Sequence, residues 1–266
     1  MNVLEKIIEQ KKILLKNLKK KFTDSLISEE IKKNNTYLNF ADAIIKKNKE
    51  KKACVIAEIK KASPSAGIII KNYNPIDIGK IYNLNGATCL SILTEEKFFL
   101  GNLNDIKKVK ENVKLPVLCK DFFIDPYQVP LAKSFGADAI LIILSGVDIQ
   151  LAKELYQAAI QYNITPILEV HSTDEAEKAI DFKKALIGIN NRNLKTLKTD
   201  IKTTFDLFKI LSNHSMPIIC ESGIKNEEDI KRIISKTGIL NFLIGESLLK
   251  DIEGSSFLKK ITQISQ

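Results

Sequence analysis

The chain is poor in the residues that most often bind metals. Its 266 residues include only four cysteines and two histidines. The cysteines are widely separated and lie in apolar, strand-like runs, so no two have the spacing of a metal-ligand pair. We therefore expect no metal centre, and we expect buried, reduced thiols at Cys54, Cys89, Cys119 and Cys220.

Long apolar runs are also absent. The longest extends from Ala139 to Leu144, whereas a membrane-spanning helix needs about 20 apolar residues. Near the N-terminus, a short apolar stretch from Ile13 to Leu15 lies between lysines, which is not the pattern of an export signal. The sequence thus predicts a protein without a membrane partner, located in the cytoplasm.

Arginine is almost missing from a strongly basic chain. Arg192 and Arg232 are the only arginines among 41 basic residues, and the formal net charge is +9. Basic proteins can bind nucleic acid by neutralising phosphates, but recognition usually draws on the planar guanidinium of arginine. The lysines gather in short clusters that are typical of solvated helix faces. We expect no nucleic-acid partner.

What the chain does contain is a regular alternation of short β-branched runs and longer amphipathic segments. Most of the runs are continuously apolar, which indicates strands that are covered on both faces. Eight strands are predicted, at 53–59, 88–93, 117–120, 139–144, 165–169, 186–190, 217–221 and 241–244. Helices are predicted at 102–112, 126–135, 148–162, 174–182, 203–211 and 226–236, with Gly136 and Gly238 as helix stops.

Eight such units favour a closed (β/α)8 TIM barrel, in the α/β class, over an open doubly wound sheet. No G-x-G-x-x-G motif follows the first strand, so the usual dinucleotide signal of the open sheet is missing. Residues 51–266 would form the barrel. Residues 1–50 would form an N-terminal helical extension, with helices at 3–20 and 36–47, that packs on the barrel within one overall domain.

Polar and charged residues follow most of the predicted strands, where barrel enzymes carry their active sites. Glu58 and Lys60 are two residues apart on the first strand, so their side chains point to the same face. The predicted rim also contains Glu95, Lys120, Asp121, Glu169, His171, Asn190, Arg192, Glu221 and Glu246. Two lysines and several glutamates at one rim indicate acid–base chemistry on an anionic substrate.

Small turns follow the last two strands. Ser222-Gly223 and Gly245-Glu246-Ser247 occupy the positions where barrels often bind phosphate with backbone N–H groups. Each glycine alone could instead serve tight-turn geometry. Their shared location after strands seven and eight favours a phosphate site.

Six ordered segments resemble the indole-3-glycerol phosphate synthase family. They read IAEIKKASPS at 56–65, LTEEKFFLG at 93–101, KDFFIDPYQ at 120–128, INNR at 189–192, ESGI at 221–224 and LIGESL at 243–248. The resemblance covers nearly the whole chain. It departs at Lys61, where arginine is frequent in the family, and at Asn193, where aspartate is usual. Neither departure removes a candidate catalytic group.

The resemblance implies a reaction of the tryptophan pathway. In it, 1-(2-carboxyphenylamino)-1-deoxy-D-ribulose 5-phosphate closes to indole-3-glycerol phosphate with loss of carbon dioxide and water. It also implies a small phosphorylated substrate and no metal or other cofactor. Lys120 would be the general acid of ring closure, and dehydration would fall to Glu58, Lys60 and Glu169, with the division of acid and base roles left open.

The resemblance further implies a set of binding residues. Asn190 and Glu221 would hold the substrate hydroxyls and the lysine ammonium groups. Substrate or phosphate would contact Ser63, Arg192, Ser222, Gly223, Gly245 and Glu246, the last through its backbone. The anthranilate ring would be enclosed by Phe99, Phe122 and Leu141. We expect a structural or capping role for His171 and an exposed position at the opposite rim for His214.

Two other functions fit parts of the sequence. A phosphoribosylanthranilate isomerase barrel would share the phosphate turns, but it needs a cysteine and an aspartate as its acid–base pair, so the lysine and glutamate set disfavours it. A catalytically silent barrel that binds nucleic acid or a partner through its lysines would show salt-sensitive DNA binding without turnover. Since no second barrel follows, we expect a monofunctional enzyme.

Overall fold

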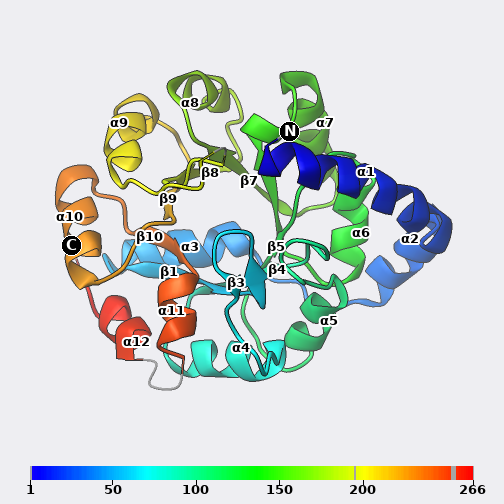
Figure 1. Ribbon diagram of the computed structural model, residues 1–266, viewed down its shortest axis with the longest axis horizontal. Coiled ribbons are helices and arrows are strands. Elements are labelled where there is room, and N and C mark those ends of the chain that lie inside the picture. The colour runs from blue at the N-terminus through cyan, green and yellow to red at the C-terminus, as the bar shows by residue number, and fades with distance from the viewer. Residues whose placement is uncertain (1, 195, 253–255, 266) are drawn as a thin grey trace.

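A computed structural model describes residues 2–194, 196–252 and 256–265. Its eight long strands are all parallel and form a closed barrel in the order β1-β10-β9-β8-β7-β6-β5-β4 (Figure 1). They are β1 Cys54–Ile59, β4 Cys89–Leu93, β5 Val117–Lys120, β6 Ala139–Ile143, β7 Thr165–Val170, β8 Leu186–Asn190, β9 Ile218–Glu221 and β10 Asn241–Ile244. The predicted TIM barrel is confirmed, and each predicted strand ends within one residue of an observed strand.

Helices surround the barrel on its outer face (Figure 1). They are α4 Pro75–Leu84, α5 Asn104–Lys110, α6 Gln128–Ser134, α7 Ile149–Gln161, α8 Thr173–Ala179, α9 Lys202–Leu211, α10 Glu227–Thr237, α11 Glu246–Lys250 and α12 Ser256–Thr262, with a 3-10 turn η1 at Leu144–Gly146. The six predicted helices correspond to α5 through α10. The left-handed residue Gly238 ends α10, as expected.

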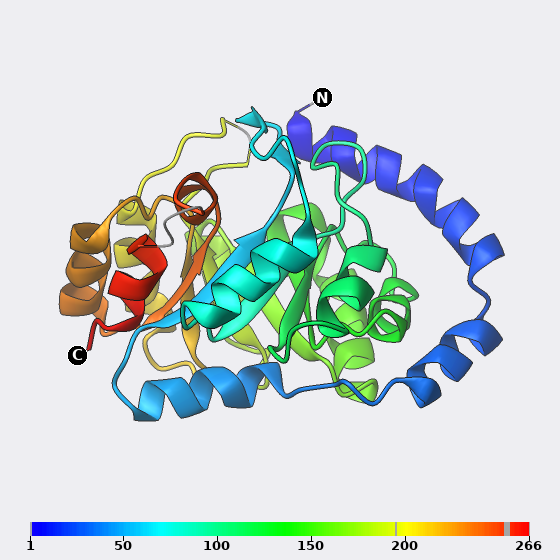
Figure 2. The same cartoon turned by 90° about the horizontal axis from the view of Figure 1, so that it is seen from below.

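Several short elements were not predicted. Helix α4 buries Pro75, Ile78, Gly79 and Tyr82. Because proline and glycine occupy two of these four positions, the apolar pattern of a helix is hard to see in the sequence. Helices α11 and α12 have only five and seven residues, too few to show a period. A small hairpin, β2 Ala62–Ser63 and β3 Gly67–Ile68, follows β1 and lies at the end of the barrel where the strands stop (Figure 2).

The first 50 residues form three helices rather than the two predicted. They are α1 Val3–Lys21, α2 Asp24–Lys33 and α3 Phe40–Lys49. Helix α2 has a single buried residue, Ile27, so no apolar stripe marks it in the sequence. Its first turn is capped by Thr23, whose hydroxyl oxygen accepts the Leu26 N–H at 3.4 Å. The helix predicted at 36–47 begins later, because Asn39 caps it.

These three helices run from one end of the barrel to the other (Figure 2). Helix α1 lies at the end where the strands stop, and its residues Val3, Leu4 and Ile7 line a cavity there. Helix α3 lies across the opposite end and buries Phe40 and Ile44 completely. The division into an extension at 1–50 and a barrel at 51–266 stays a prediction.

The apolar core has two parts. Side chains inside the barrel form the smaller one, which includes Ile56, Leu118 and Leu243 and is closed at its base by Phe40 and Ile44. The larger one fills the layer between the strands and the surrounding helices. Alternate residues of each strand supply the two parts, so side chains fill both the barrel interior and the layer around it.

All four cysteines are buried and unpaired, as predicted. Cys54 and Cys89 belong to the barrel interior, and Cys119 and Cys220 belong to the layer between strands and helices. Burial raises the pKa of the Cys54 and Cys119 thiols to about 12, so both stay protonated and unreactive. Within the described residues, no helix has the length and apolar character needed to cross a bilayer.

Candidate active site

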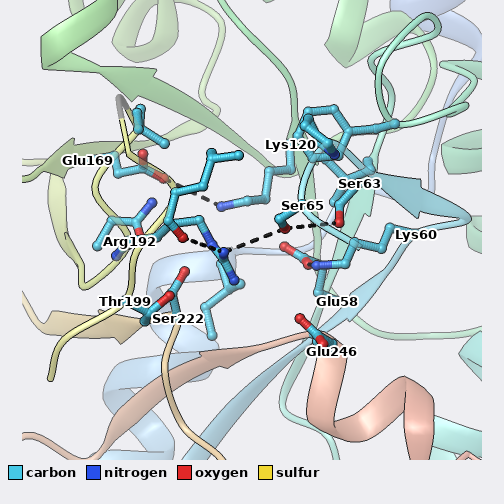
Figure 3. A pocket seen from close by; sticks show the side chains of 18 of the residues that line it. Glu58, Lys60, Ser63, Ser65, Lys120, Glu169, Arg192, Thr199, Ser222 and Glu246 are labelled. Carbon is cyan, nitrogen blue, oxygen red and sulfur yellow. Dashed lines mark hydrogen bonds and ion pairs between the residues drawn. The ribbon is translucent and has the colours of Figure 1, made fainter. Parts of the chain in front are cut away.

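A cavity of about 540 Å³ opens at the carboxyl ends of the strands. It is lined by every residue to which the sequence assigned a catalytic or substrate-binding role except Glu221, which is buried and 1% exposed. The side chains that converge on the cavity come from several strands and from the loops that follow them (Figure 3). The predicted residues that line it are Glu58, Lys60, Ser63, Phe99, Lys120, Phe122, Leu141, Glu169, Asn190, Arg192, Ser222, Gly223, Gly245 and Glu246.

Lys120, the last residue of β5, lies between two carboxylates. Its Nζ is 3.0 Å from Glu221 Oε2 and 3.5 Å from Glu169 Oε2. Burial lowers the pKa of this lysine, but the charges of Glu221 and Glu169 outweigh that cost and raise the pKa above its ordinary value. Lys120 therefore carries a full charge and points it into the cavity (Figure 3).

Glu221 at the end of β9 supports Lys120 from below. Its carboxylate lies against Gly188 of β8, where a Cβ atom would collide with Oε1. Burial raises the pKa of Glu221, Lys120 opposes the rise, and the negative charge of Glu169 adds to it. A glycine at position 188 is thus what lets this carboxylate reach the lysine.

Glu58 and Lys60 form a second pair at the end of β1. The Lys60 ammonium donates to Glu58 Oε1 at 2.5 Å, which confirms that the two side chains share a face. Burial raises the pKa of Glu58, but Lys60 and Lys120 lower it by more, so the carboxylate stays ionised. Gly245 after β10 leaves room for this pair, because a Cβ there would meet Glu58.

One side of the cavity is suited to an anion. Ser222 and Gly223 both have positive φ, 64° and 78°, and this turn brings their backbone to the cavity wall. Gly245 and Glu246 lie at the start of α11 in the wall beside them. Arg192 lies near this side of the cavity, where its guanidinium donates to Leu197 O at 3.0 Å and to Ser65 Oγ at 3.5 Å (Figure 3).

The remainder of the wall is apolar. The rings of Phe99 and Phe122 lie with centroids 6.2 Å apart, and Leu141 also lines the space. Helix α1 and the loop after β8 add apolar side chains that sequence reasoning missed: Val3, Leu4, Ile7, Leu194 and Leu197. The apolar stripe of α1 was visible in the sequence, but it indicated packing on the barrel and not proximity to the cavity.

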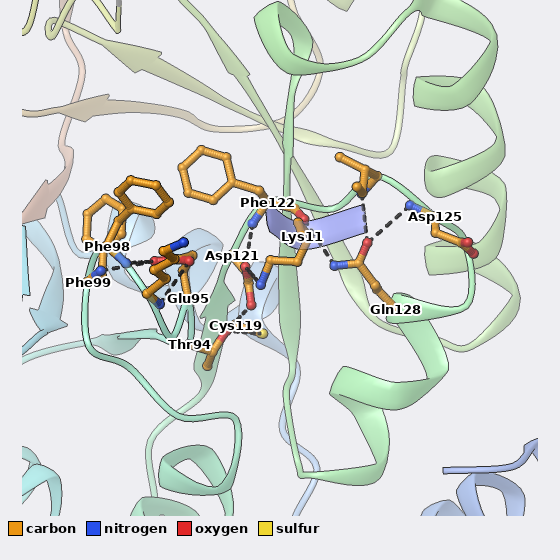
Figure 4. Close-up of polar contacts among 12 residues, drawn as sticks. Lys11, Thr94, Glu95, Phe98, Phe99, Cys119, Asp121, Phe122, Asp125 and Gln128 are labelled. Atoms are coloured by element: carbon orange, nitrogen blue, oxygen red, sulfur yellow. Dashed lines mark hydrogen bonds and ion pairs between the residues drawn. The ribbon is translucent and has the colours of Figure 1, made fainter. Parts of the chain in front are cut away.

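Two carboxylates of the predicted rim, Glu95 and Asp121, bind neighbouring parts of the chain (Figure 4), although Asp121 also lines the cavity. Glu95 accepts the backbone N–H groups of Phe98 and Phe99 at 2.6 and 3.0 Å and so shapes the loop after β4. Asp121 pairs with Lys11 of α1 at 2.6 Å and accepts the Thr94 hydroxyl at 2.7 Å. Both groups therefore hold surrounding structure in place.

The two histidines lie at opposite ends of the barrel. His171 follows β7, with Nε2 3.1 Å from Glu169 Oε1 and Nδ1 3.3 Å from Glu175 Oε2. Its backbone N–H donates to the same Glu175 oxygen at 2.8 Å, while Ser172 caps α8, so the structural or capping role of His171 stays a prediction. His214 precedes β9 with Nε2 2.9 Å from Ala185 O, and it is half-buried rather than exposed as predicted, because that contact holds the ring against the barrel.

Comparison with known proteins identifies the family. The profile of the family described as Indole-3-glycerol phosphate synthase matches residues 4–261. The chain belongs to the indole-3-glycerol phosphate synthase family. It is 39% identical to the indole-3-glycerol phosphate synthase of Prochlorococcus marinus (strain MIT 9515), over 98% of this chain and 89% of that protein. It is 38% identical to the Carboxydothermus hydrogenoformans indole-3-glycerol phosphate synthase, over 93% and 94% of the two chains.

Structural comparison agrees on the architecture of this family member. A solved structure from Aquifex aeolicus VF5 matches with a TM-score of 0.63 over 85% of this chain and 98% of its own. At 12% sequence identity, this likeness concerns the fold alone. Among the residues that the structure describes, no group of three or more His, Cys, Asp and Glu side chains is arranged to hold a metal ion.

Proposed function

We propose that this protein is an indole-3-glycerol phosphate synthase, a carboxy-lyase of tryptophan biosynthesis. It would convert 1-(2-carboxyphenylamino)-1-deoxy-D-ribulose 5-phosphate to indole-3-glycerol phosphate, carbon dioxide and water. Family membership over residues 4–261 supports the reaction. The observation that carries the proposal for this chain is the position of Lys120, which lines the cavity and lies between the carboxylates of Glu169 and Glu221.

Lys120 would act as the general acid of ring closure. The aryl carbon attacks the ribulose carbonyl, and a proton or positive charge on the carbonyl oxygen stabilises the transition state. The two carboxylates keep the ammonium charged and fix its direction. Glu221, which does not line the cavity, would support Lys120 from behind without touching the substrate.

Dehydration would use the remaining charged groups. One group must remove a proton from the substrate and another must protonate the leaving hydroxyl. Glu58, Lys60 and Glu169 all line the cavity, and the division of these roles among them stays open. Asn190 would hold a substrate hydroxyl. Its side-chain oxygen Oδ1 accepts the backbone N–H of Arg192 at 2.9 Å, and this hydrogen bond fixes the orientation of the amide.

The two contrasting walls suggest how the substrate lies. Its phosphate would bind the turns at Ser222-Gly223 and Gly245-Glu246, with Ser63, Lys60 and Arg192 nearby. The carboxyphenyl ring would lie on the apolar side, between Phe99, Phe122 and Leu141. The ribulose carbonyl, which lies between the phosphate and the ring in the substrate, would then lie beside Lys120. We further propose that the enzyme works in the cytoplasm and without a nucleic-acid partner.

A direct test measures product fluorescence. The chain contains no tryptophan, so indole emission would arise from product alone. With the carboxyphenylamino-deoxyribulose phosphate in chelator-treated buffer, we expect turnover by the wild type and a loss of about 100-fold or more in Lys120→Met, because a positioned general acid contributes 10²–10⁴-fold. Lys209→Met removes a 76% exposed lysine and is the matched control, with unchanged turnover.

Each outcome separates the alternatives. A fully active Lys120→Met variant would refute Lys120 as the general acid. A folded wild type without turnover would instead favour a silent barrel, which salt-sensitive binding to DNA would then support.

A further inference from the structure

The proposed reaction consumes one proton per turnover. The aryl carbon that bears the carboxylate bonds to ribulose C2, and the carboxylate leaves as carbon dioxide with its bonding electron pair returned to the ring system. The former carbonyl oxygen takes up two protons and leaves as water, while C1 releases one proton. One proton must therefore enter from solvent in each cycle, and Lys120 ends its acid step as a neutral amine.

A line of titratable groups connects Lys120 with the outside of the barrel. Glu169 Oε2 is 3.5 Å from Lys120 Nζ, and the other oxygen of the same carboxylate is 3.1 Å from His171 Nε2. His171 Nδ1 is 3.3 Å from Glu175 Oε2 in the first turn of α8. Side-chain exposure rises along this line, from 2% for Glu169 to 11% for His171 and 16% for Glu175.

His171 stands behind the cavity rather than in it, because it does not line the space and reaches it only through Glu169. The Nε2 atom of His171 is buried and lies at ion-pair distance from Glu169. Its N–H bond does not point directly at the carboxylate oxygen, so the contact is an ion pair and not a well-aligned hydrogen bond. The charged groups that face the ring are Glu169 from β7 and Glu175 from α8, with Lys120 of β5 beyond Glu169.

We propose that Glu175 and His171 form a proton relay that recharges Lys120 through Glu169, an inference that rests on the proposed function. The imidazolium gives its Nε2 proton to Glu169, and Glu169 gives a proton to the neutral amine of Lys120. Rotation of the side chain about its Cα–Cβ and Cβ–Cγ bonds then brings the bare Nε2 to Glu175, which delivers a proton that it has taken up from solvent. Burial lowers the pKa of His171, but Glu169 and Glu175 together raise it to about 10, so the resting ring is charged.

The relay makes a prediction that a structural role does not. Recharging is needed only after the first turnover. In His171→Asn, the first turnover should proceed at the wild-type rate in a rapid-mixing experiment. Later turnovers should slow about tenfold, which is less than the 10²–10⁴-fold that proton transfer by a positioned side chain contributes. Added imidazole should restore the later turnovers, and kcat/KM should stay unchanged, because the slowed step follows product formation.

Two further variants sharpen the test. Glu175→Gln keeps the size of the side chain and should show the same pattern with a smaller loss, which maintains the test if His171→Asn folds poorly. His214→Asn replaces the other histidine, at the opposite end of the barrel, and should match the wild type in every phase. The rate of later turnovers in solvent D2O should fall more steeply for His171→Asn than for the wild type.

The results separate three cases. A His171→Asn variant that is unaffected overturns the relay, and so does one whose first turnover is slowed as much as later ones without imidazole rescue, because His171 would then only position Glu169. A wild type that makes no indole-3-glycerol phosphate would refute the proposed function itself, before any variant is compared.

Discussion

Gly188 decides where the Glu221 carboxylate can lie. This glycine is in β8, flanked by β7 and β9, and its missing side chain is the space that Oε1 of Glu221 occupies. Gly245 does the same for Glu58 beside Lys60. At the residue scale, the two charged pairs of the site therefore depend on two positions that carry no chemistry of their own.

Gly188→Ala should impair catalysis while leaving the barrel folded. The added methyl displaces Glu221, so Lys120 loses the shorter of its two ion pairs, and a displacement of about 1 Å at an active site can lower kcat roughly 100-fold. Steady-state kinetics measure the loss. Gly146→Ala is the control, since a Cβ there makes only ordinary contacts. Equal kcat in both variants would show that Glu221 does not depend on this space.

At the scale of elements, sequence reasoning succeeded where a segment is uniform. Most residues of each barrel strand are apolar, and each strand was predicted to within a residue. It failed for α2, which buries only Ile27, and for α11, whose short length shows no period. The site residues were predicted from family motifs, whereas Val3, Leu4 and Ile7 were missed because their position at the cavity depends on a contact far away in sequence.

One such contact is the ion pair between Lys11 of α1 and Asp121 of the loop after β5. The Lys11 side chain is only 3% exposed, and removal of one partner of a buried pair costs about 3–5 kcal/mol. Lys11→Met should therefore lower the free energy of unfolding by roughly that amount. It should also raise KM more than it lowers kcat, because α1 would no longer close the apolar wall.

Urea denaturation and steady-state kinetics test this prediction. Lys12→Met is a neighbouring control, because the Lys12 side chain is 59% exposed and pairs with Glu9 on the same helix. Identical stability and KM in the two variants would mean that Lys11 does not hold α1 in place. The double variant Lys11→Met/Asp121→Asn should recover part of the lost stability, since no buried charge is left unpaired.

At the scale of the whole molecule, stability depends on pH through groups whose pKa changes on folding. His171 has a folded pKa of about 10 against an ordinary value of about 6.5 in the unfolded chain. Its stabilising contribution is therefore complete below pH 6.5 and is lost as the pH rises through 10. The difference in free energy of unfolding between wild type and His171→Asn should be largest near pH 6 and should shrink towards pH 10.

Denaturation curves at several pH values measure this difference. A constant difference across the range would mean that the imidazole is neutral in the folded protein, and it would also remove the resting imidazolium from which the proposed relay starts.

The burial of all four thiols has a practical consequence. No native cysteine in the folded protein is open to a maleimide dye, so a cysteine introduced at the surface would be labelled selectively. Ile13 on α1 is 57% exposed and faces away from the core. A fluorophore at Ile13→Cys would report, through its anisotropy, whether α1 lifts from the barrel each time a substrate molecule enters.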